Sequence, residues 1–434
     1  MDITLVALLL LILLLVLLCS GLWIGLGILC TGMIAIAMFS SAPVWQVTVT
    51  TIWGDSAEWS LTALPMFIWM GEILFRTRIS ESLFNGLAPW LTRIPGRLLH
   101  VNVIGCALFG SISGSSTATC ATISKIALPQ LTARKYPEAI TLGSLASAGT
   151  LGILIPPSVI MIVYAVAADV SILEIFRAGV IPGLIASALF SAYIAVWALL
   201  NPSQIPKPER SYTLGEKLRS MRELFPVLLL IVGVAGGMFT GFATATEVGA
   251  LGVVGALIIA RSGGSLTWAS FKESAYGALR ISCMIALILA GSTVLSVAMA
   301  FTGIPKALAA WVASLHLSPY MLVTALVVVY LILGTALEGV AMILLTTTIT
   351  LPLVVNAGFD PVWFGIFIVL MTEIAALSPP VGFNLFVMQS FTGRSSGYVA
   401  WATLPFVLLL VATVAIIAIF PATVSWLPNV LRPT

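Results

Sequence analysis

The sequence predicts an all-α, polytopic membrane protein built from two inverted repeats. Of its 434 residues 60% are hydrophobic and only 8% are charged, whereas a soluble chain carries about 25% charged residues. The apolar residues form successive runs of helical length, and one block of sequence recurs in the second half. A soluble or disordered chain is therefore excluded. Because the basic residues are spread along the chain and the net charge is only +3, no nucleic-acid surface is expected.

The N-terminal half comprises residues 1–200 and begins with two apolar runs, 3–19 and 22–39. No basic residue precedes the first run, so we expect a membrane span there and not a cleaved signal peptide. A short amphipathic segment further on is typical of an arm that lies in the membrane interface. The elements predicted for this half are scaffold helices, the arm 79–91, a first re-entrant hairpin 98–135 and a broken helix 139–168.

The first hairpin is predicted from the tract GSISGSSTATCATIS at 110–124, since a plain span would be richer in Leu and Ile. One half-helix should end near Ile112, the chain should turn at Ser113 and Gly114, and Ser115 should cap a second half-helix. The free N–H groups of that second half-helix favour a carboxylate, whereas carbonyl and hydroxyl oxygens in the turn favour a cation. The alternative is that small residues only permit close helix packing.

The first broken helix is predicted from the adjacent prolines Pro156 and Pro157. Proline has no N–H group, so the carbonyls of Gly152 and Ile153 lose their helical partners. A bound cation can replace such a partner inside a membrane, although a lone Pro-Pro pair is usually only a kink. Polar side chains close enough in sequence to assist are those of Ser147, Thr150 and Ser158.

A proline-rich and then charged linker, 201–223, divides the chain near its middle, and we expect it to be cytoplasmic. Beyond the linker, parts of the first half recur 223 residues later in the chain, and we call this constant spacing the repeat offset. Pro129 in KIALPQL corresponds to Pro352 in TITLPLV, and the double proline 156–157 corresponds to 379–380. Because both matches share one offset without a gap, we infer an internal duplication.

The C-terminal half, 224–434, is therefore expected to repeat the architecture of the first. Its predicted elements are scaffold helices, the arm 304–314, a second hairpin 318–356, a broken helix 361–390 and a last span 398–427. The tip of the second hairpin is predicted at Gly334 and Thr335, where Thr335 and Glu338 fit a capping box that starts a half-helix. Thr244 and Glu247 fit the same pattern.

The second broken helix contains Pro379 and Pro380, which should free the carbonyls of Ala375 and Ala376. Its acidic residue Glu373 lies in the middle of an apolar segment and has no capping role. Such a carboxylate can balance the charge of a cation, with pairing between helices as the alternative. Polar side chains that could assist at this second break are those of Thr372, Ser378 and Asn384.

Charge predicts how the two copies are oriented, because Lys and Arg accumulate in cytoplasmic loops. The first hairpin is flanked by Arg93, Arg97, Arg134 and Lys135, whereas the second, at about 316–360, has no Lys or Arg at either end. The hairpins should therefore open on opposite sides of the membrane. The same rule places most basic residues in the cytoplasm and both chain ends outside it.

Membrane enzymes and ATP-driven pumps have no evident chemistry in this sequence. The two histidines, His100 and His316, lie outside the apolar spans, and no H-E-x-x-H, G-x-S-x-G or G-x-x-x-x-G-K-[ST] sequence occurs. We therefore expect no catalytic residue and no organic cofactor.

Several segments, taken together, resemble one known family. They are SISGSSTATCATISKIALPQL at 111–131, GTLGILIPPS at 149–158, GFATATEVGALG at 241–252, FDPVWFG at 359–365 and LSPPVGFNLFV at 377–387. The chain resembles, over essentially its whole length, the large membrane subunit (DctM type) of tripartite ATP-independent periplasmic (TRAP) transporters. The resemblance implies a secondary transporter of the inner membrane that imports an organic acid with sodium ions and uses an elevator-type movement of the hairpins and broken helices.

The resemblance also implies partners and site residues. The partners would be a separate small four-helix membrane subunit and a periplasmic binding protein that delivers the carboxylate substrate. Substrate would lie between the hairpin tips, near Ser115, Ser116, Thr117 and Asn384. Some members carry an acidic residue where this chain has Thr119. Sodium ions would be bound by residues of the hairpin turns and by the backbone carbonyls that the prolines free. The residues expected around sodium are Ser113, Gly114, Thr150, Gly152, Ile153, Gly334, Thr335, Thr372, Ala375, Ala376 and Ser378.

Other functions remain open on sequence grounds. The leading alternative is a sodium-coupled carboxylate carrier that works without a binding protein, because hairpins and broken helices occur in several ion-coupled families. A passive pore built on the same repeat is a further alternative, and it would give sustained flux without an ion gradient.

Overall fold

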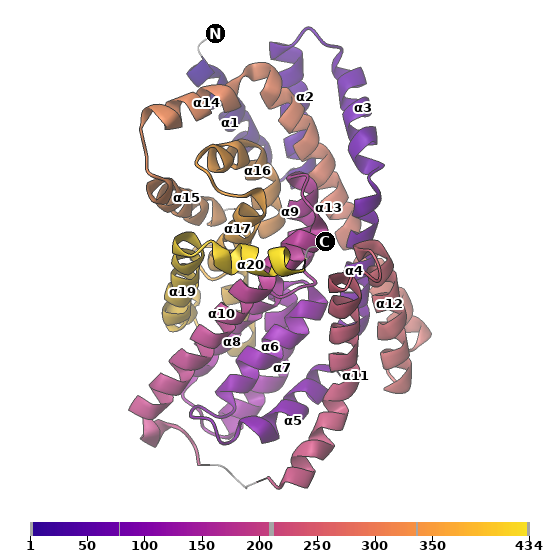
Figure 1. Cartoon of the computed structure of the whole chain (residues 1–434), viewed down its shortest axis with the longest axis vertical. Coiled ribbons are helices and arrows are strands. Elements are labelled where there is room, and N and C mark those ends of the chain that lie inside the picture. Colours follow the sequence, from indigo (N-terminus) through magenta and orange to yellow (C-terminus); the bar gives the residue numbers. More distant parts are fainter. Residues whose placement is uncertain (1–2, 78, 208–211, 336, 432–434) are drawn as a thin grey trace.

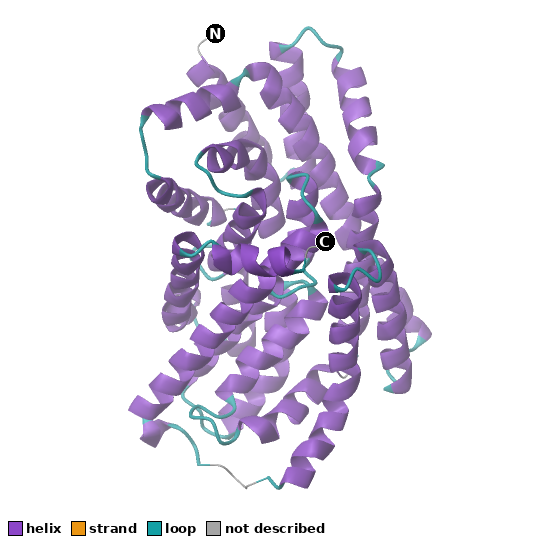
Figure 2. Cartoon of the chain, viewed as in Figure 1, coloured by secondary structure: helices purple, strands orange, loops and turns teal. Residues whose placement is uncertain are grey.

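The computed structural model describes residues 3–77, 79–207, 212–335 and 337–431. Over these residues the chain is helical and contains no strand (Figure 2). Six of the helices are long and apolar enough to cross a membrane, namely α10, α11, α12, α13, α16 and α19, and the bent pair α8–α9 makes a seventh. The predicted all-α polytopic membrane fold is confirmed.

The N-terminal half contains ten α-helices among the described residues. They are α1 (Ile3–Cys19), α2 (Ile24–Phe39), α3 (Val44–Ser56), α4 (Ala63–Phe75), α5 (Ile79–Leu91), α6 (Leu99–Ser113), α7 (Ser116–Ala133), α8 (Glu138–Leu154), α9 (Val159–Ala167) and α10 (Ile172–Leu200), with short 3₁₀ helices at Trp59–Thr62 and Pro202–Gln204.

The C-terminal half likewise contains ten described α-helices. They are α11 (Leu214–Phe239), α12 (Ala245–Ser262), α13 (Trp268–Thr302), α14 (Ile304–Ser314), α15 (Pro319–Gly334), α16 (Gly339–Asn356), α17 (Pro361–Ala376), α18 (Phe383–Thr392), α19 (Ser396–Ile419) and α20 (Ala422–Val430). The last span predicted at 398–427 is divided, because α19 ends before Phe420 and Pro421, and α20 then begins as a separate helix.

The helices recur at the repeat offset that the prolines indicated. α7 begins at Ser116 and α16 begins at the equivalent position, Gly339, and each is 18 residues long. The arms α5 and α14 end at Leu91 and Ser314, which are again equivalent positions. The duplication therefore extends from the prolines to whole helices.

The two copies are placed in opposite directions along the molecule. In Figure 1, the arm α5 lies at the lower end with the linker between α10 and α11, whereas the arm α14 lies at the upper end near α1 and α2. The hairpins follow their arms, since α6–α7 occupy the lower half and α15–α16 the upper half. This arrangement is that of inverted repeats.

The buried core lies where the hairpins pack on the broken helices. Tyr164 of α9 meets Phe364 of α17 edge to face, with ring centroids 6.1 Å apart. Tyr330 of α15 meets Phe367 of α17 in the same way at 5.9 Å. Edge-to-face pairs of this kind each add about 0.5–1.5 kcal/mol beyond the area they bury. The broken helix α17 thus joins elements of both halves.

Candidate functional site

The tip of the first hairpin is a tight turn with a capped helix behind it. α6 ends at Ser113, and Gly114 has a left-handed φ of +62°, which only glycine adopts without strain. The side chain of Ser115 accepts a hydrogen bond from the Ala118 N–H at 3.3 Å and so caps α7. The hydroxyl groups of Ser113 and Thr119 lie 2.7 Å apart and tie the turn to that helix.

The tip of the second hairpin is capped at the equivalent position but by a different residue type. Glu338, the counterpart of Ser115 at the repeat offset, is the N-cap of α16 and accepts from the Val340 N–H at 3.1 Å. The predicted capping box starting at Thr335 is wrong, because Thr335 ends α15 and its hydroxyl donates to the Ile332 carbonyl at 2.7 Å. The box predicted at Thr244 and Glu247 is present at the start of α12.

The two double prolines interrupt the helices on either side of them. α8 and α9 are separated by residues 155–158 and bent by 46°, and Ser158 caps α9 by accepting from the Met161 N–H at 3.4 Å. α17 and α18 are separated by residues 377–382. The bonds Pro156–Pro157 and Pro379–Pro380 are both cis.

The two hairpin tips and the two proline breaks meet at one cavity of about 310 Å³. Its lining includes the first residues of α7, α9, α16 and α18, namely Ser116, Val159, Gly339 and Phe383. A helix N-terminus presents unpaired N–H groups and about half a positive charge. Four such ends on one cavity favour a negatively charged group. The described lining also includes three glutamates, Glu72, Glu338 and Glu373, and no Lys or Arg side chain, so a cation would be attracted as well.

A buried polar network lies against this cavity. Asn384 Nδ2 donates to Ser116 Oγ at 2.9 Å and to the Ala146 carbonyl at 3.0 Å, and so joins α18 to α7 and α8. Glu373 is buried, with 1% exposure, and its carboxyl group is hydrogen bonded to Ser116. Among the described residues, Glu373 Oε2, Asn384 Oδ1 and Ser147 Oγ have no hydrogen-bond partner. Buried oxygens without donors are costly unless a cation or water satisfies them.

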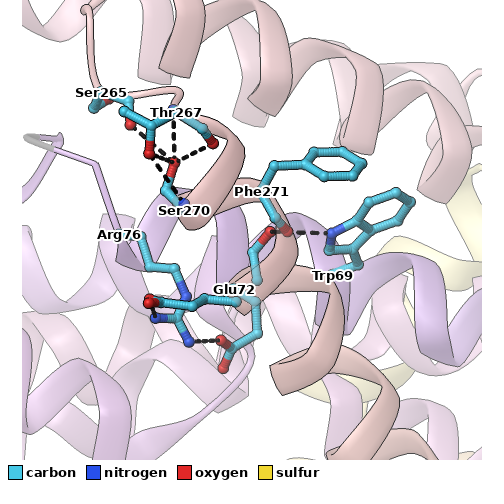
Figure 3. Close-up of polar contacts among 9 residues, drawn as sticks. Trp69, Glu72, Arg76, Ser265, Thr267, Ser270 and Phe271 are labelled. Carbon is cyan, nitrogen blue, oxygen red and sulfur yellow. Dashed lines mark hydrogen bonds and ion pairs between the residues drawn. The ribbon is translucent and has the colours of Figure 1, made fainter.

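Helices α4 and α13 close one wall of the cavity. Glu72 of α4 lines it, together with Ile281 and Ile285 of α13. Arg76 donates to Glu72 at 3.1 Å and to Glu273 of α13 at 2.9 Å, which ties the two helices together. Figure 3 shows this Arg76 contact with Glu72, and near it the hydrogen bond from Trp69 Nε1 to Ser274 Oγ at 3.3 Å.

Many of the residues predicted from the sequence line this cavity. They are Ser113, Gly114, Ser115, Ser116, Thr117, Ile153, Thr372, Glu373 and Ala376.

The other predicted site residues are not in the described lining of the cavity. Gly152 packs on Gly110, and Thr150 is buried with its hydroxyl donating to the Ser147 carbonyl at 2.6 Å. The sequence predicted that the prolines leave the Ala375 carbonyl without a partner. This prediction is wrong, because the Ser378 N–H donates to that carbonyl at 3.0 Å. The remainder are Asn384, Gly334, Thr335 and Ser378, with Pro156, Pro157, Pro379 and Pro380 at the breaks.

Sequence reasoning missed the contribution of α4 and α13. Glu72 is an acidic residue inside an apolar segment, which is the same signal that singled out Glu373. Glu338 was interpreted first as part of a cap, with charge balance for a cation as the alternative, and it lines the cavity. Ile281 and Met284 carry no signal in the sequence, because an apolar residue that faces a cavity looks like any other in a long span.

The fold and the cavity define a class: a multi-pass helical permease with paired hairpins that meet at a central site. The chain matches, over residues 11–423, the model of the tripartite ATP-independent periplasmic transporter, DctM component, and it belongs to that family. It is thus a transporter subunit of the inner membrane and not an enzyme.

Relatives and a solved structure agree with this assignment. The chain is 32% identical to the C4-dicarboxylate TRAP transporter large permease protein DctM of Pseudomonas aeruginosa, covering 92% of this chain and 93% of that one. It is 28% identical to the sialic acid TRAP transporter large permease protein SiaM of Vibrio cholerae, over 95% and 96%. The crystal structure of the Alcanivorax borkumensis YdaH transporter has the same fold, with a TM-score of 0.67 at 12% identity, covering 95% and 98%.

Proposed function

We propose that this chain imports a small carboxylate together with sodium ions, and that substrate and ions bind at the cavity between the hairpin tips. The observation that carries the proposal is that four helix N-termini and the buried carboxyl group of Glu373, whose Oε2 has no hydrogen-bond partner among the described residues, line one small cavity.

The anionic half of the proposal rests on the helix ends. Ser115, Ser116 and Thr117 offer hydroxyl groups next to the N–H groups of α7, and a carboxylate can accept from both. Related permeases carry the names of C4-dicarboxylate and sialic acid transporters, and both substrates are carboxylates. We therefore assign a carboxylate to the space between the tips.

The proposed binding of sodium ions rests on buried oxygens that accept no hydrogen bond from the described part of the chain. Glu373 Oε2, Asn384 Oδ1 and Ser147 Oγ are oxygens without donors in the described residues, and half-helix breaks in transporters hold coupling cations in this way. A cation beside Glu373 would compensate a buried carboxylate that has no ion pair among the described residues. In this proposal Ser113, Gly114 and the break at Pro156 serve one ion, and Gly334, Thr335 and the break at Pro379 serve a second.

The proposed movement is an elevator. The hairpins and broken helices form the mobile part, whereas α1–α4, α11–α13 and the arms α5 and α14 form the fixed part. The family is tripartite and periplasmic by its description, so we further propose a small four-helix membrane subunit and a periplasmic binding protein as partners.

Uptake by proteoliposomes tests the proposal. The chain is reconstituted with its small partner, and uptake of labelled C4-dicarboxylates and sialic acid is measured with and without an inward sodium gradient and the binding protein. Uptake that needs both is expected. Uptake with sodium alone would favour the stand-alone carrier, and sustained flux without a gradient would favour a pore.

Two variants test the site within the same assay. Ser116→Ala removes the hydroxyl shared by Asn384 and Glu373, and it should reduce sodium-driven uptake about tenfold or more, since it weakens a buried network in the transport cavity. Ser390→Ala is the matched control, because Ser390 is exposed on α18 and its hydroxyl donates only to the Val387 carbonyl at 2.7 Å. Equal uptake by both variants would refute the assignment of Ser116.

A further inference from the structure

A second cavity lies at the opposite end of the first hairpin, away from the tip. It has a volume of about 590 Å³, within the range of about 300–1,000 Å³ that is usual for small-ligand sites. The arm α5, the base of α6–α7 and the start of α11 enclose it. In Figure 1 these elements meet at the lower end of the molecule, near the linker between the halves. We call it the basal pocket.

The described lining of the basal pocket is cationic. Its described lining includes four basic residues and two acidic ones, namely Arg97, Arg134, Lys207, Arg219, Glu216 and Glu223. Arg97 and Arg134 are half-buried. Arg97 Nη1 donates to the Pro206 carbonyl, and Arg134 Nη1 donates to Gln130 Oε1 at 2.5 Å. These contacts hold the two guanidinium groups in place at the wall of the pocket.

The internal repeat supplies a comparison for this charge. The equivalent pocket at the base of the second hairpin, of about 560 Å³, is lined by Tyr320, Ala357 and Phe359, which are the counterparts of Arg97, Arg134 and Tyr136 at the repeat offset. Glu174 and Asp360 also line it, and the described lining has no Lys or Arg. The other walls of the two pockets come from different elements, α5 and α11 in the first and α10, α19 and α20 in the second. The base of one hairpin is therefore basic and that of the other acidic, so the fold of a hairpin base does not itself require basic charge.

The surroundings of the basal pocket are those of a membrane interface. Trp90 of the amphipathic arm α5 donates from Nε1 to the Lys217 carbonyl at 3.2 Å, and the Lys217 ammonium lies 5.6 Å from the centre of its ring. Ser220 of α11 donates to the Gly86 carbonyl of α5 at 3.2 Å. Trp and Lys are the residues that anchor helices at headgroup depth, and basic pockets there bind lipid phosphates.

We propose that the basal pocket binds a phosphate group, with Arg97 and Arg134 as its principal donors. Arginine presents a planar set of N–H donors that matches phosphate oxygens in pairs. The phosphate is that of an anionic phospholipid headgroup or free inorganic phosphate. Because Arg97 and Arg134 belong to the hairpin base and Arg219 to α11, a bound phosphate links the hairpin to the arm and linker region. This inference does not depend on the transported substrate.

Calorimetric titration of the delipidated, full-length chain tests the proposal. The probes are dioctanoyl phosphatidylglycerol, inorganic phosphate and dioctanoyl phosphatidylcholine. We expect phosphatidylglycerol to bind, and the double variant R97Q/R134Q to weaken its Kd about tenfold or more, because each lost arginine contact with a phosphate is a charge-assisted hydrogen bond. The matched control is R93Q/R222Q, which removes two exposed basic residues outside the basal pocket.

The outcomes separate the two sources of phosphate. Binding of phosphatidylglycerol without competition by inorganic phosphate assigns a lipid, whereas competition assigns the phosphate group alone. Equal weakening in R97Q/R134Q and R93Q/R222Q, or no binding of either anion, overturns the proposal. R97K/R134K keeps the charge and should recover part of the affinity, and gel-filtration profiles show whether each variant remains folded.

Discussion

Glu373, Ser116 and Asn384 bring three elements to one point, since they lie on α17, α7 and α18. The counterpart of Glu373 in the first copy of the repeat is Thr150, whose hydroxyl is satisfied by its own helix. The two copies of the repeat are therefore alike in backbone but not in charge. Of the two broken helices, only the second brings a carboxylate to the described lining of the cavity between the hairpin tips.

The charge of Glu373 can be tested by an isosteric change. In Glu373→Gln the hydrogen bond to Ser116 can be kept while the negative charge is lost, so we expect sodium-driven uptake to fall by about tenfold or more as charge compensation for a buried cation disappears. The measurement is initial uptake against sodium concentration in proteoliposomes. Glu247→Gln, on an exposed cap of α12, is the control, and equal behaviour of the two variants would contradict the role.

Gly152 is required for packing, and this is also testable. A Cβ at Gly152 would lie 2.1 Å from the Cα of Gly110, which is far inside van der Waals contact, so Gly152→Ala should destabilise the fold by about 2 kcal/mol or more. Gly236→Ala is the matched control, because a Cβ there meets nothing within 4 Å. The midpoint of thermal unfolding in detergent should fall for the first variant and stay or rise for the second.

At the scale of elements, the half-helices depend on their caps. Ser115 caps α7 in the cavity, and Ser395 caps α19 far from it by accepting from the Tyr398 N–H at 3.3 Å. The two caps are chemically alike but differ in what lies next to them.

This pair predicts a separation of stability from transport. Ser115→Ala and Ser395→Ala should each cost about 1 kcal/mol of stability through a lost N-cap. Only Ser115→Ala should also raise the KM for substrate, because its hydroxyl lines the cavity. Melting midpoints and uptake kinetics, measured on the same preparations, check both statements. A raised KM in both variants would mean that the effect is only structural.

The elements were largely predictable because their signals are local. Small residues at Ser113 and Gly114, the double prolines and the constant offset each fix a break or a turn without help from distant contacts. The second tip lies where it was predicted, between Gly334 and Gly339, but the capping box was mistaken, because Thr335 is the C-cap of α15 and Glu338 itself caps α16. The roles of Asn384 and Glu72 depend on which helices meet, and one sequence alone does not contain that information.

At the scale of the whole molecule, the contact between α13 and the second hairpin decides whether that hairpin can move. Ser292 Oγ of α13 donates to the Leu344 carbonyl of α16 at 2.5 Å, and the hydroxyls of Ser296 and Thr348 lie 2.6 Å apart. A second contact, from Asn102 Nδ2 of α6 to Ser144 Oγ of α8 at 2.9 Å, lies within the part that we propose to be mobile.

Cross-linking these two contacts distinguishes an elevator from a rigid site. In a chain whose five native cysteines are replaced by serine, oxidation of S296C/T348C should block uptake and reduction should restore it, because the bond fixes the mobile part to the scaffold. Oxidation of N102C/S144C should leave uptake nearly unchanged. The measurement is uptake before and after oxidation, with single-cysteine variants as references. Full activity of oxidised S296C/T348C would contradict the movement.

The tandem repeat has a consequence for biogenesis. A segment that crosses the bilayer an odd number of times delivers the chain to the far side, so a second copy of it starts from the opposite leaflet and is inserted upside down. An even number would leave both copies in parallel. The opposite placement of α5 and α14 in Figure 1 thus follows if the repeated segment crosses the membrane an odd number of times. Adding or removing a single crossing in the first half would invert everything that follows it.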